Sequence, residues 1–142
     1  MYKEILLPID LNDPGTQDKA VSTAIEYAKA FGARLHAVTI VPDLGVGVVG
    51  TFFPEDYAQK AKAAAEAELR DFVKRRVPDG VVAEHAVALG TIYEEIIEYA
   101  KEIGADLIVM GSHRPELKDY LIGPNASRVV RHADCSVLVV RG

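Results

Sequence analysis

Cysteine is nearly absent from this sequence, because Cys135 is the only one among its 142 residues. A lone cysteine excludes an intrachain disulfide framework and gives a zinc ion no set of thiolate ligands. Apolar runs are short, and none approaches the ~20 residues of a membrane-spanning helix. The start of the chain, Met1 to Pro8, lacks the basic leader and the long apolar run of a signal peptide. These absences predict a cytoplasmic protein with no membrane span.

Basic residues are in the minority, with 16 lysines and arginines against 21 aspartates and glutamates and a formal net charge of −5. A general nucleic-acid-binding surface normally carries a strong basic excess, so we expect no nucleic-acid partner. The composition, 49% hydrophobic and 26% charged, is typical of a globular domain rather than a disordered or fibrous chain. We expect residues 1–142 to form a single domain.

Short apolar segments alternate with helical patterns along the chain. The apolar segments predict strands over Lys3–Ile9, Leu35–Val41, Val81–Leu89, Ala105–Met110 and Ser136–Val140. Apolar residues at helical spacing predict helices over Thr16–Phe31, Glu55–Arg76, Thr91–Ile103 and Gly123–His132. Alternating apolar strands and helices predict an α/β fold, an open five-stranded parallel sheet with helices on both faces and a Rossmann-like arrangement. Thr91 and Glu94 also have the spacing of a capping box at the start of the third helix.

Ligands of such sheets bind outside the carboxyl ends of the strands, where the winding direction reverses. The segments to inspect are therefore Pro8–Asp10, Ile40–Pro42, Leu89–Thr91 and Met110–His113. A phosphoacceptor receiver domain has a similar layout, but the third strand here ends at Gly90 without the aspartate such a domain needs. That class is therefore disfavoured.

Two glycines flank the segment between the fourth strand and the last helix, Gly111 and Gly123. Glycine lets the backbone approach an anion, and the unpaired amides at a helix start can donate to it. The pair therefore suits a phosphate site, although an ordinary strand-to-helix turn followed by an N-cap has the same appearance. The spacing alone leaves both alternatives open.

Three runs of residues carry a specific resemblance: Ile5–Asp10, Asp106–His113 and Val129–Val140. Together they make the chain similar to the universal stress protein family over essentially all of its 142 residues. The nucleotide-binding branch of that family has Gly-x-x-Gly, nine further residues, and then Gly-Ser or Gly-Thr. Gly111 and Gly123 match the first and last of these glycines.

Two positions depart from that pattern. Arg114 replaces the middle glycine, and Pro124 replaces the hydroxyl residue. The run Ser112-His113-Arg114-Pro115, with a later Gly-x-Asn-Ala, resembles a bacterial subgroup in which Arg-Pro is usual, and this resemblance still implies ATP binding. The subgroup accounts for Arg114 but not for Pro124.

The resemblance implies a fold like that of the adenine nucleotide alpha hydrolases and a stress-response protein that binds ATP, or ADP or AMP, with magnesium. The residues it implies at the nucleotide are Pro8, Asp10, Ile40, Met110, Gly111, His113, Arg114, Gly123, Asn125 and Ala126. It places Asp10 near the ribose and the metal, and Ile40 near adenine. Asn125 and Ala126 fall at a helix start that cradles phosphate, where Arg114 either adds a charge-assisted bond or remains solvated.

No P-loop lysine, nucleophile-elbow serine or metal-binding histidine pair stands at a readable spacing. We therefore expect a regulatory protein, not an enzyme, with very slow ATP hydrolysis at most. The alternative is a stress-related dimeric interaction module that binds no nucleotide, and Pro124 would be its mark. In either case the apolar strand Val137–Val140 is expected at a sheet edge, paired with its copy in a homodimer; assembly into a tetramer is left open.

The remaining candidates have simpler interpretations. Residues 43–54 mix glycines with apolar residues, which fits either a flap that packs on a partner or ligand or a loop that packs over the core. His36 and His85 are expected to be partly exposed sheet residues, and Cys135 a small buried hydrophobe. For the basic cluster of Arg128, Arg131 and His132, an interpretation as the solvated face and the C-terminal charge of a helix is favoured over the alternative, a contact with a phosphate.

Overall fold

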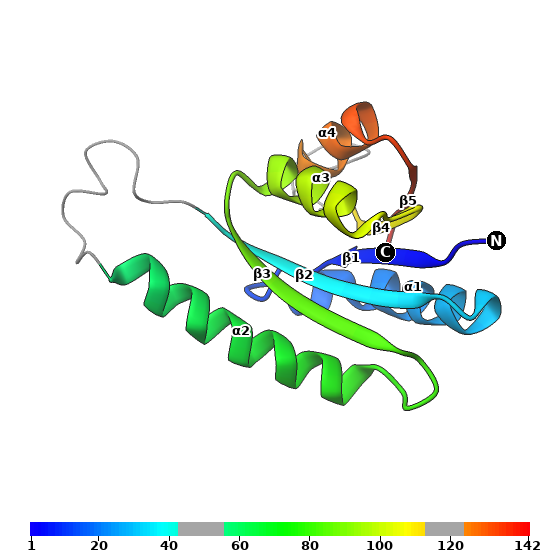
Figure 1. The fold of residues 1–142 in the computed structure, drawn as a ribbon, viewed down its shortest axis with the longest axis horizontal. Coiled ribbons are helices and arrows are strands. Elements are labelled where there is room, and N and C mark those ends of the chain that lie inside the picture. The colour runs from blue at the N-terminus through cyan, green and yellow to red at the C-terminus, as the bar shows by residue number, and fades with distance from the viewer. Residues whose placement is uncertain (43–55, 113–123) are drawn as a thin grey trace.

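Strands and helices alternate along the chain in the order that the sequence predicts (Figure 1). The structure is a computed structural model that describes residues 1–42, 56–112 and 124–142. The strands are β1 (Glu4–Pro8), β2 (Arg34–Pro42), β3 (Ala83–Gly90), β4 (Leu107–Gly111) and β5 (Ser136–Val140). The helices are the short 3-10 helix η1 (Pro14–Gln17), α1 (Asp18–Phe31), α2 (Tyr57–Arg76), α3 (Ile92–Ile103) and α4 (Pro124–His132).

The strands form one five-stranded sheet in the order β3-β2-β1-β4-β5, and every pair is parallel. From β1 in the middle, the chain first winds outward through β2 to β3, and then crosses over to β4 and β5 on the other side. The winding direction therefore reverses between β1 and β4. This arrangement confirms the α/β, Rossmann-like class and places β5 at a sheet edge, as predicted.

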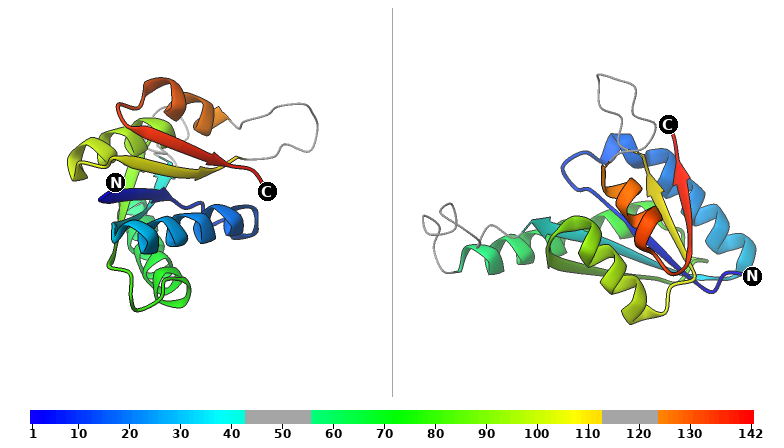
Figure 2. Two further views of the ribbon diagram at one scale, coloured as in Figure 1. Left: turned by 90° about the vertical axis from the view of Figure 1, so that its right-hand side faces the viewer. Right: turned by 90° about the horizontal axis from the view of Figure 1, so that it is seen from above.

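Side chains of β1 alternate between two cores, one on each face of the sheet. Ile5 and Leu7 are buried on the face covered by α1 and α2, where they join residues such as Leu69. Leu6 points to the opposite face and packs with Ile96 of α3 and Val129 of α4. Figures 1 and 2 show these helix pairs on opposite sides of the sheet. The middle of this central strand, Ile5 to Leu7, is apolar and fully buried, as expected where both faces of a sheet are covered.

Glycines directly follow two of the helices, which end at Phe31 and Ile103 as predicted. Gly32 follows α1 with φ of 63°, and Gly104 follows α3 with φ of 66°, a left-handed conformation that glycine adopts without penalty. The predicted capping box at the start of α3 is wrong, because the Thr91 side chain makes no capping hydrogen bond. The Glu94 carboxylate instead accepts a bond from the Tyr93 hydroxyl, at 3.3 Å.

The apolar residues whose helical spacing predicts α2 are buried only in the second half of the helix. Leu69 and Phe72 are buried against the sheet, whereas Ala58 near the start of the helix is exposed. Figure 2 shows the first turns of α2 extending past the end of β2. Among the described helices, none combines the length and apolarity that crossing a bilayer requires.

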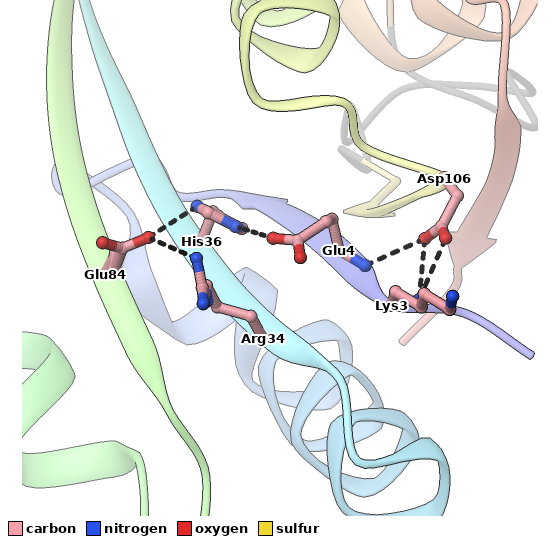
Figure 3. A network of polar contacts seen from close by, with 6 residues as sticks. All are labelled: Lys3, Glu4, Arg34, His36, Glu84 and Asp106. Carbon is pink, nitrogen blue, oxygen red and sulfur yellow. Dashed lines mark hydrogen bonds and ion pairs between the residues drawn. The ribbon is translucent and has the colours of Figure 1, made fainter.

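A polar network joins four strands at their amino ends (Figure 3). The carboxylate of Asp106, just before β4, accepts bonds from the backbone amides of Lys3 and Glu4 at 2.9 to 3.2 Å. His36 lies between Glu4 and Glu84, which belong to the two neighbouring strands. The prediction that His36 is partly exposed is wrong, since the residue is only 4% exposed, whereas His85 is half-buried as expected.

Candidate functional site

A cavity of about 410 Å³ opens at the carboxyl ends of β1, β2 and β4. This volume lies within the roughly 300–1,000 Å³ typical of small-molecule sites. The cavity occupies the point where the winding of the sheet reverses, since β1 and β4 are neighbours that lead to different halves of the sheet. It is therefore the place where the fold leads us to expect a ligand.

The cavity brings together most of the residues that the resemblance implies at a nucleotide. Its lining includes Pro8, Asp10, Ile40, Met110, Gly111, Asn125 and Ala126. The other three, His113, Arg114 and Gly123, lie outside the described residues, as does the segment 43–54. Residues from opposite ends of the sequence therefore meet at one site because parallel strands end at the same edge.

One wall of the cavity is apolar. Ile40 of β2, Ile92 and Ile96 of α3, and Met110 of β4 line it together. Thr39 fixes the strand ends beside this wall, because its buried hydroxyl donates to the Ile9 carbonyl at 2.7 Å. Such a wall can accept a flat apolar ring, whose burial contributes on the order of 25 cal/mol per Å².

Asp10 supplies the carboxylate of the cavity. Asp10 is exposed, and its Oδ1 accepts a hydrogen bond from the Asn12 backbone amide at 2.9 Å. In the described parts of the chain, no group of three or more His, Cys, Asp or Glu residues is placed to hold a metal ion. Asp10 is therefore not part of a three-residue metal cage within the described residues.

The amino terminus of α4 also lines the cavity, through Pro124, Asn125 and Ala126. Backbone amides at a helix start are donors suited to an anion, but Pro124 has none to offer. The basic residues further along α4 do not line the cavity: the Arg128 guanidinium lies 5.2 Å from the centre of the Tyr93 ring, and Arg131 is exposed. Their interpretation as a solvated helix face agrees with this placement.

Three polar residues of the lining are absent from the predicted site residues: Asn12, Gln17 and Ser112. Ser112 lies within the segment Met110–His113 that the sequence analysis singled out, whereas the other two were missed. Asn12 follows Asp10 in a turn-rich segment, and that proximity could have pointed to it. Gln17 stands seven positions after Asp10 at the end of η1 and has no motif around it. Its approach to the cavity depends on how the turn folds back.

Cys135 lies in a separate, smaller cavity of about 120 Å³ near the amino ends of β4 and β5. The residue is half-buried and packs against the core on the α3 and α4 side. Burial raises the pKa of its thiol, and the charges of Asp106 and Asp134 raise it further, while a backbone hydrogen bond acts in the opposite direction. A raised pKa leaves less thiolate for reaction, so this position does not resemble a redox site.

Comparisons with known proteins agree with the fold. A family described as "Universal stress protein family" matches residues 1–141. Universal stress protein G of Escherichia coli O157:H7 is 34% identical over 143 residues, covering 99% of this chain and all of the relative. The structure of universal stress protein UspA from Lactobacillus plantarum matches with a TM-score of 0.74 and 27% identity over 99% of this chain and 98% of that one. A universal stress protein solved in complex with cAMP matches with a TM-score of 0.69 and 24% identity over 99% and 97% of the two chains.

Proposed function

The chain belongs to the universal stress protein family, and from this membership and the cavity at the carboxyl edge of the sheet we propose that it is a regulatory protein that binds an adenine nucleotide. The observation that carries the proposal is the convergence of Asp10, Gly111 and Asn125 on one cavity. These residues lie far apart in the sequence, and each matches a different part of the family's nucleotide-binding pattern.

In the proposed complex, each part of the nucleotide meets a wall of suitable chemistry. Adenine lies against the apolar wall beside Ile40, and the ribose lies near Asp10. The phosphates extend past Gly111 toward the start of α4, where Asn125 and Ala126 present backbone amides. The related structure solved with cAMP supports an adenine nucleotide as the class of ligand.

ATP with magnesium is the proposed occupant, with ADP and AMP as alternatives. The metal would be shared between Asp10 and the phosphates, because magnesium is commonly bound by one or two carboxylates together with substrate phosphates and water. Within the described residues the cavity lining holds one serine, Ser112, one carboxylate, Asp10, and no lysine or histidine. We assign Asp10 to the ribose and the metal rather than to a catalytic base, which leaves Ser112 without an activating partner among those residues. We therefore propose a binding role in the cytoplasm, with very slow hydrolysis at most.

The proposed assembly is a homodimer of single-domain chains in which the β5 edges, Val137–Val140, pair across a two-fold axis. β5 has β4 on one side and no described strand on the other. A half-buried, apolar edge strand is an aggregation hazard unless it is covered, and a closed dimer covers it. Further assembly into a tetramer is compatible with this pairing.

The second candidate function is a dimeric interaction module that binds no nucleotide, and Pro124 favours it. Proline at the start of α4 removes both the hydroxyl and the amide that the family pattern would place at the phosphates. This candidate shares the fold and the dimer with the first, so only ligand binding separates them.

Calorimetric titration with ATP, ADP, AMP and cAMP, each with and without magnesium, tests the proposal. Melting curves give an independent measure, because a ligand present at about a hundred times its dissociation constant adds roughly 2.7 kcal/mol to the free energy of unfolding. Mass spectrometry of ligand released from purified protein would identify the natural occupant. Absence of binding and of any melting shift with all four ligands would leave the interaction module as the function.

A further inference from the structure

The side-chain amide of Gln17 binds the backbone of the turn that carries Asp10. Its Oε1 accepts from the Asp10 backbone amide at 2.7 Å. Its Nε2 donates to the carbonyl oxygen of Asp10 at 2.8 Å and to that of Asp13, also at 2.8 Å. One side chain therefore satisfies both polar backbone groups of Asp10 and closes the loop between β1 and α1.

The chemistry of these contacts requires an amide. The acceptor must face an N–H and the donor must face two carbonyl oxygens, so only one orientation of the Gln17 side chain satisfies all three bonds. A carboxylate of the same size would keep the first bond and place a negative oxygen against the two carbonyls. A hydrocarbon side chain of similar length would make none of the bonds.

Helix α1 fixes the position of Gln17. Gln17 is the last residue of η1 and directly precedes α1, whose residues Ala20 and Val21 are buried in the core. The turn itself is exposed at Asp10 and Asn12, so it has little packing of its own. Gln17 transmits the fixed position of the helix to the turn.

Asp10 depends on the turn for the direction of its carboxylate. Its Oδ1 accepts from the Asn12 amide at 2.9 Å, and its carbonyl accepts from the Asp13 amide at 3.2 Å. These local bonds set the carboxylate relative to the turn, and Gln17 sets the turn relative to the cavity. An exposed carboxylate without this second restraint would sample several directions, at a cost in affinity for any ligand that needs one of them.

We propose that Gln17 is a positioning residue, which holds Asp10 in the orientation that the ribose and the metal of the bound nucleotide require. The inference rests on the proposed function and deepens it. Gln17 acts through Asp10, so its contribution disappears when the Asp10 carboxylate is absent. A direct bond from Gln17 to the nucleotide would persist in that background.

A double-mutant cycle separates these roles. ADP binding in the presence of magnesium is measured by calorimetry for the wild type, Asp10→Ala, Gln17→Met and the double variant. Each single substitution is expected to weaken binding by about tenfold, which corresponds to one lost hydrogen bond to a charged group. Asp10→Ala removes the carboxylate that makes this bond, and Gln17→Met misplaces it. The double variant is expected to bind within about twofold of Asp10→Ala, since coupled residues are not additive.

Gln17→Glu is the sharper variant, because it keeps size and one of the three bonds. It should weaken binding of ADP with magnesium as much as Gln17→Met does. Gln59→Glu is the matched control, since it adds the same charge at an exposed position of α2 and should leave binding unchanged. Hydrogen exchange of the Asp10 amide gives a readout without nucleotide, and it should accelerate by about tenfold or more in Gln17→Met.

The outcomes are distinct. Additive losses in the double variant would show that Gln17 contacts the ligand or acts on the fold, and would overturn the positioning role while leaving nucleotide binding intact. If both Gln17 variants bind ADP with unchanged affinity while Asp10→Ala binds it more weakly, the positioning role of Gln17 is overturned and the proposed nucleotide site is not. Wild-type affinity in Asp10→Ala would overturn the proposed ligand site, and the inference with it.

Discussion

The imidazole Nε2 of His36 lies 2.7 Å from Oε1 of Glu4, across the neighbouring strands β2 and β1. The ring is buried, and in the described structure its other nitrogen, Nδ1, has no hydrogen-bond partner and lies 3.5 Å from the Glu84 carboxylate. The bond to Glu4 therefore satisfies a polar group that water cannot reach. This pair stabilises the amino ends of the sheet, away from the cavity.

Glu4→Ala is expected to lower the free energy of unfolding by about 1–3 kcal/mol, because it leaves the buried Nε2 of His36 without its hydrogen-bond partner. Glu84→Ala is the matched control: that carboxylate is 55% exposed and makes the longer contact, so its loss should cost about 0–1 kcal/mol. Chemical denaturation with an unchanged m-value measures both. If the two variants lose the same amount of unfolding free energy, the bond to Glu4 is not the one that stabilises the buried His36.

Asp10→Ala is expected to remove most of the magnesium dependence of nucleotide binding without unfolding the protein, since the residue is exposed. The measurement compares ADP affinity with magnesium and with a chelator. Asp71→Ala removes the same charge from the exposed face of α2 and serves as the control. If Asp10→Ala binds ADP with the wild-type affinity and the wild-type response to magnesium, the role given to Asp10 is wrong.

Pro124→Ser is expected to tighten ATP binding roughly ten- to a hundredfold, because it restores a hydroxyl and a backbone amide at the start of α4. Adenosine, which has no phosphate, should gain much less. Proline suits the first position of a helix, so the wild-type fold tolerates it. Calorimetry on both proteins with both ligands checks the difference. An equal gain for adenosine, or none for ATP, would mean that this helix start is not the phosphate cradle.

The β5 edge offers a test of the dimer through one backbone amide. Val140 accepts a bond from the Ser112 amide of the loop after β4, so the alternate residue Val139 directs its N–H toward the open edge. Val139→Pro should therefore convert a dimer to a monomer at tens of micromolar in light scattering, while Val139→Thr, which keeps the amide, should remain dimeric. A monomeric wild type would exclude this assembly.

The thiol of Cys135 should react slowly with iodoacetamide. Burial raises the pKa of the thiol, so at about pH 8 its thiolate fraction and its reaction rate should both lie below those of N-acetylcysteine. The rate should rise with pH beyond the point where N-acetylcysteine reaches its plateau. Asp134→Asn should move that rise to lower pH, because the Asp134 charge contributes to the shift. A rate matching that of the free thiol would contradict the effect of burial.

Much of the fold and part of the site follow from the sequence because their causes are local. Each strand is a short apolar run, and the rule that parallel strands end at one edge brings Asp10 and Gly111 together without knowledge of any contact. The two left-handed helix ends were readable because glycine accepts that conformation best.

The remaining features depend on tertiary contacts that no spacing reveals. His36 is buried because Glu4 and Glu84 of the adjacent strands come beside it, and that register is set by the whole sheet. Gln17 reaches Asp10 only through the particular course of the turn between them. Thr91 and Glu94 have the spacing of a capping box, but spacing permits the bond without requiring it. Ala58 has the spacing of a buried helix residue, but it is exposed because the first turns of α2 extend beyond the sheet.

The reversal of the winding between β1 and β4 has a consequence for protein synthesis. The cavity lining draws on Asp10 and Ile40 early in the sequence, on Ile92 and Ile96 of α3, and on Met110, Gly111 and Asn125 later in it. A nascent chain that has left the ribosome only as far as β3 already holds Asp10 and Ile40, yet it lacks the residues of α3, β4 and α4 that complete the cavity. The cavity therefore first exists when the start of α4 has emerged, and a product truncated before α4 has no complete site with which to compete for ligand.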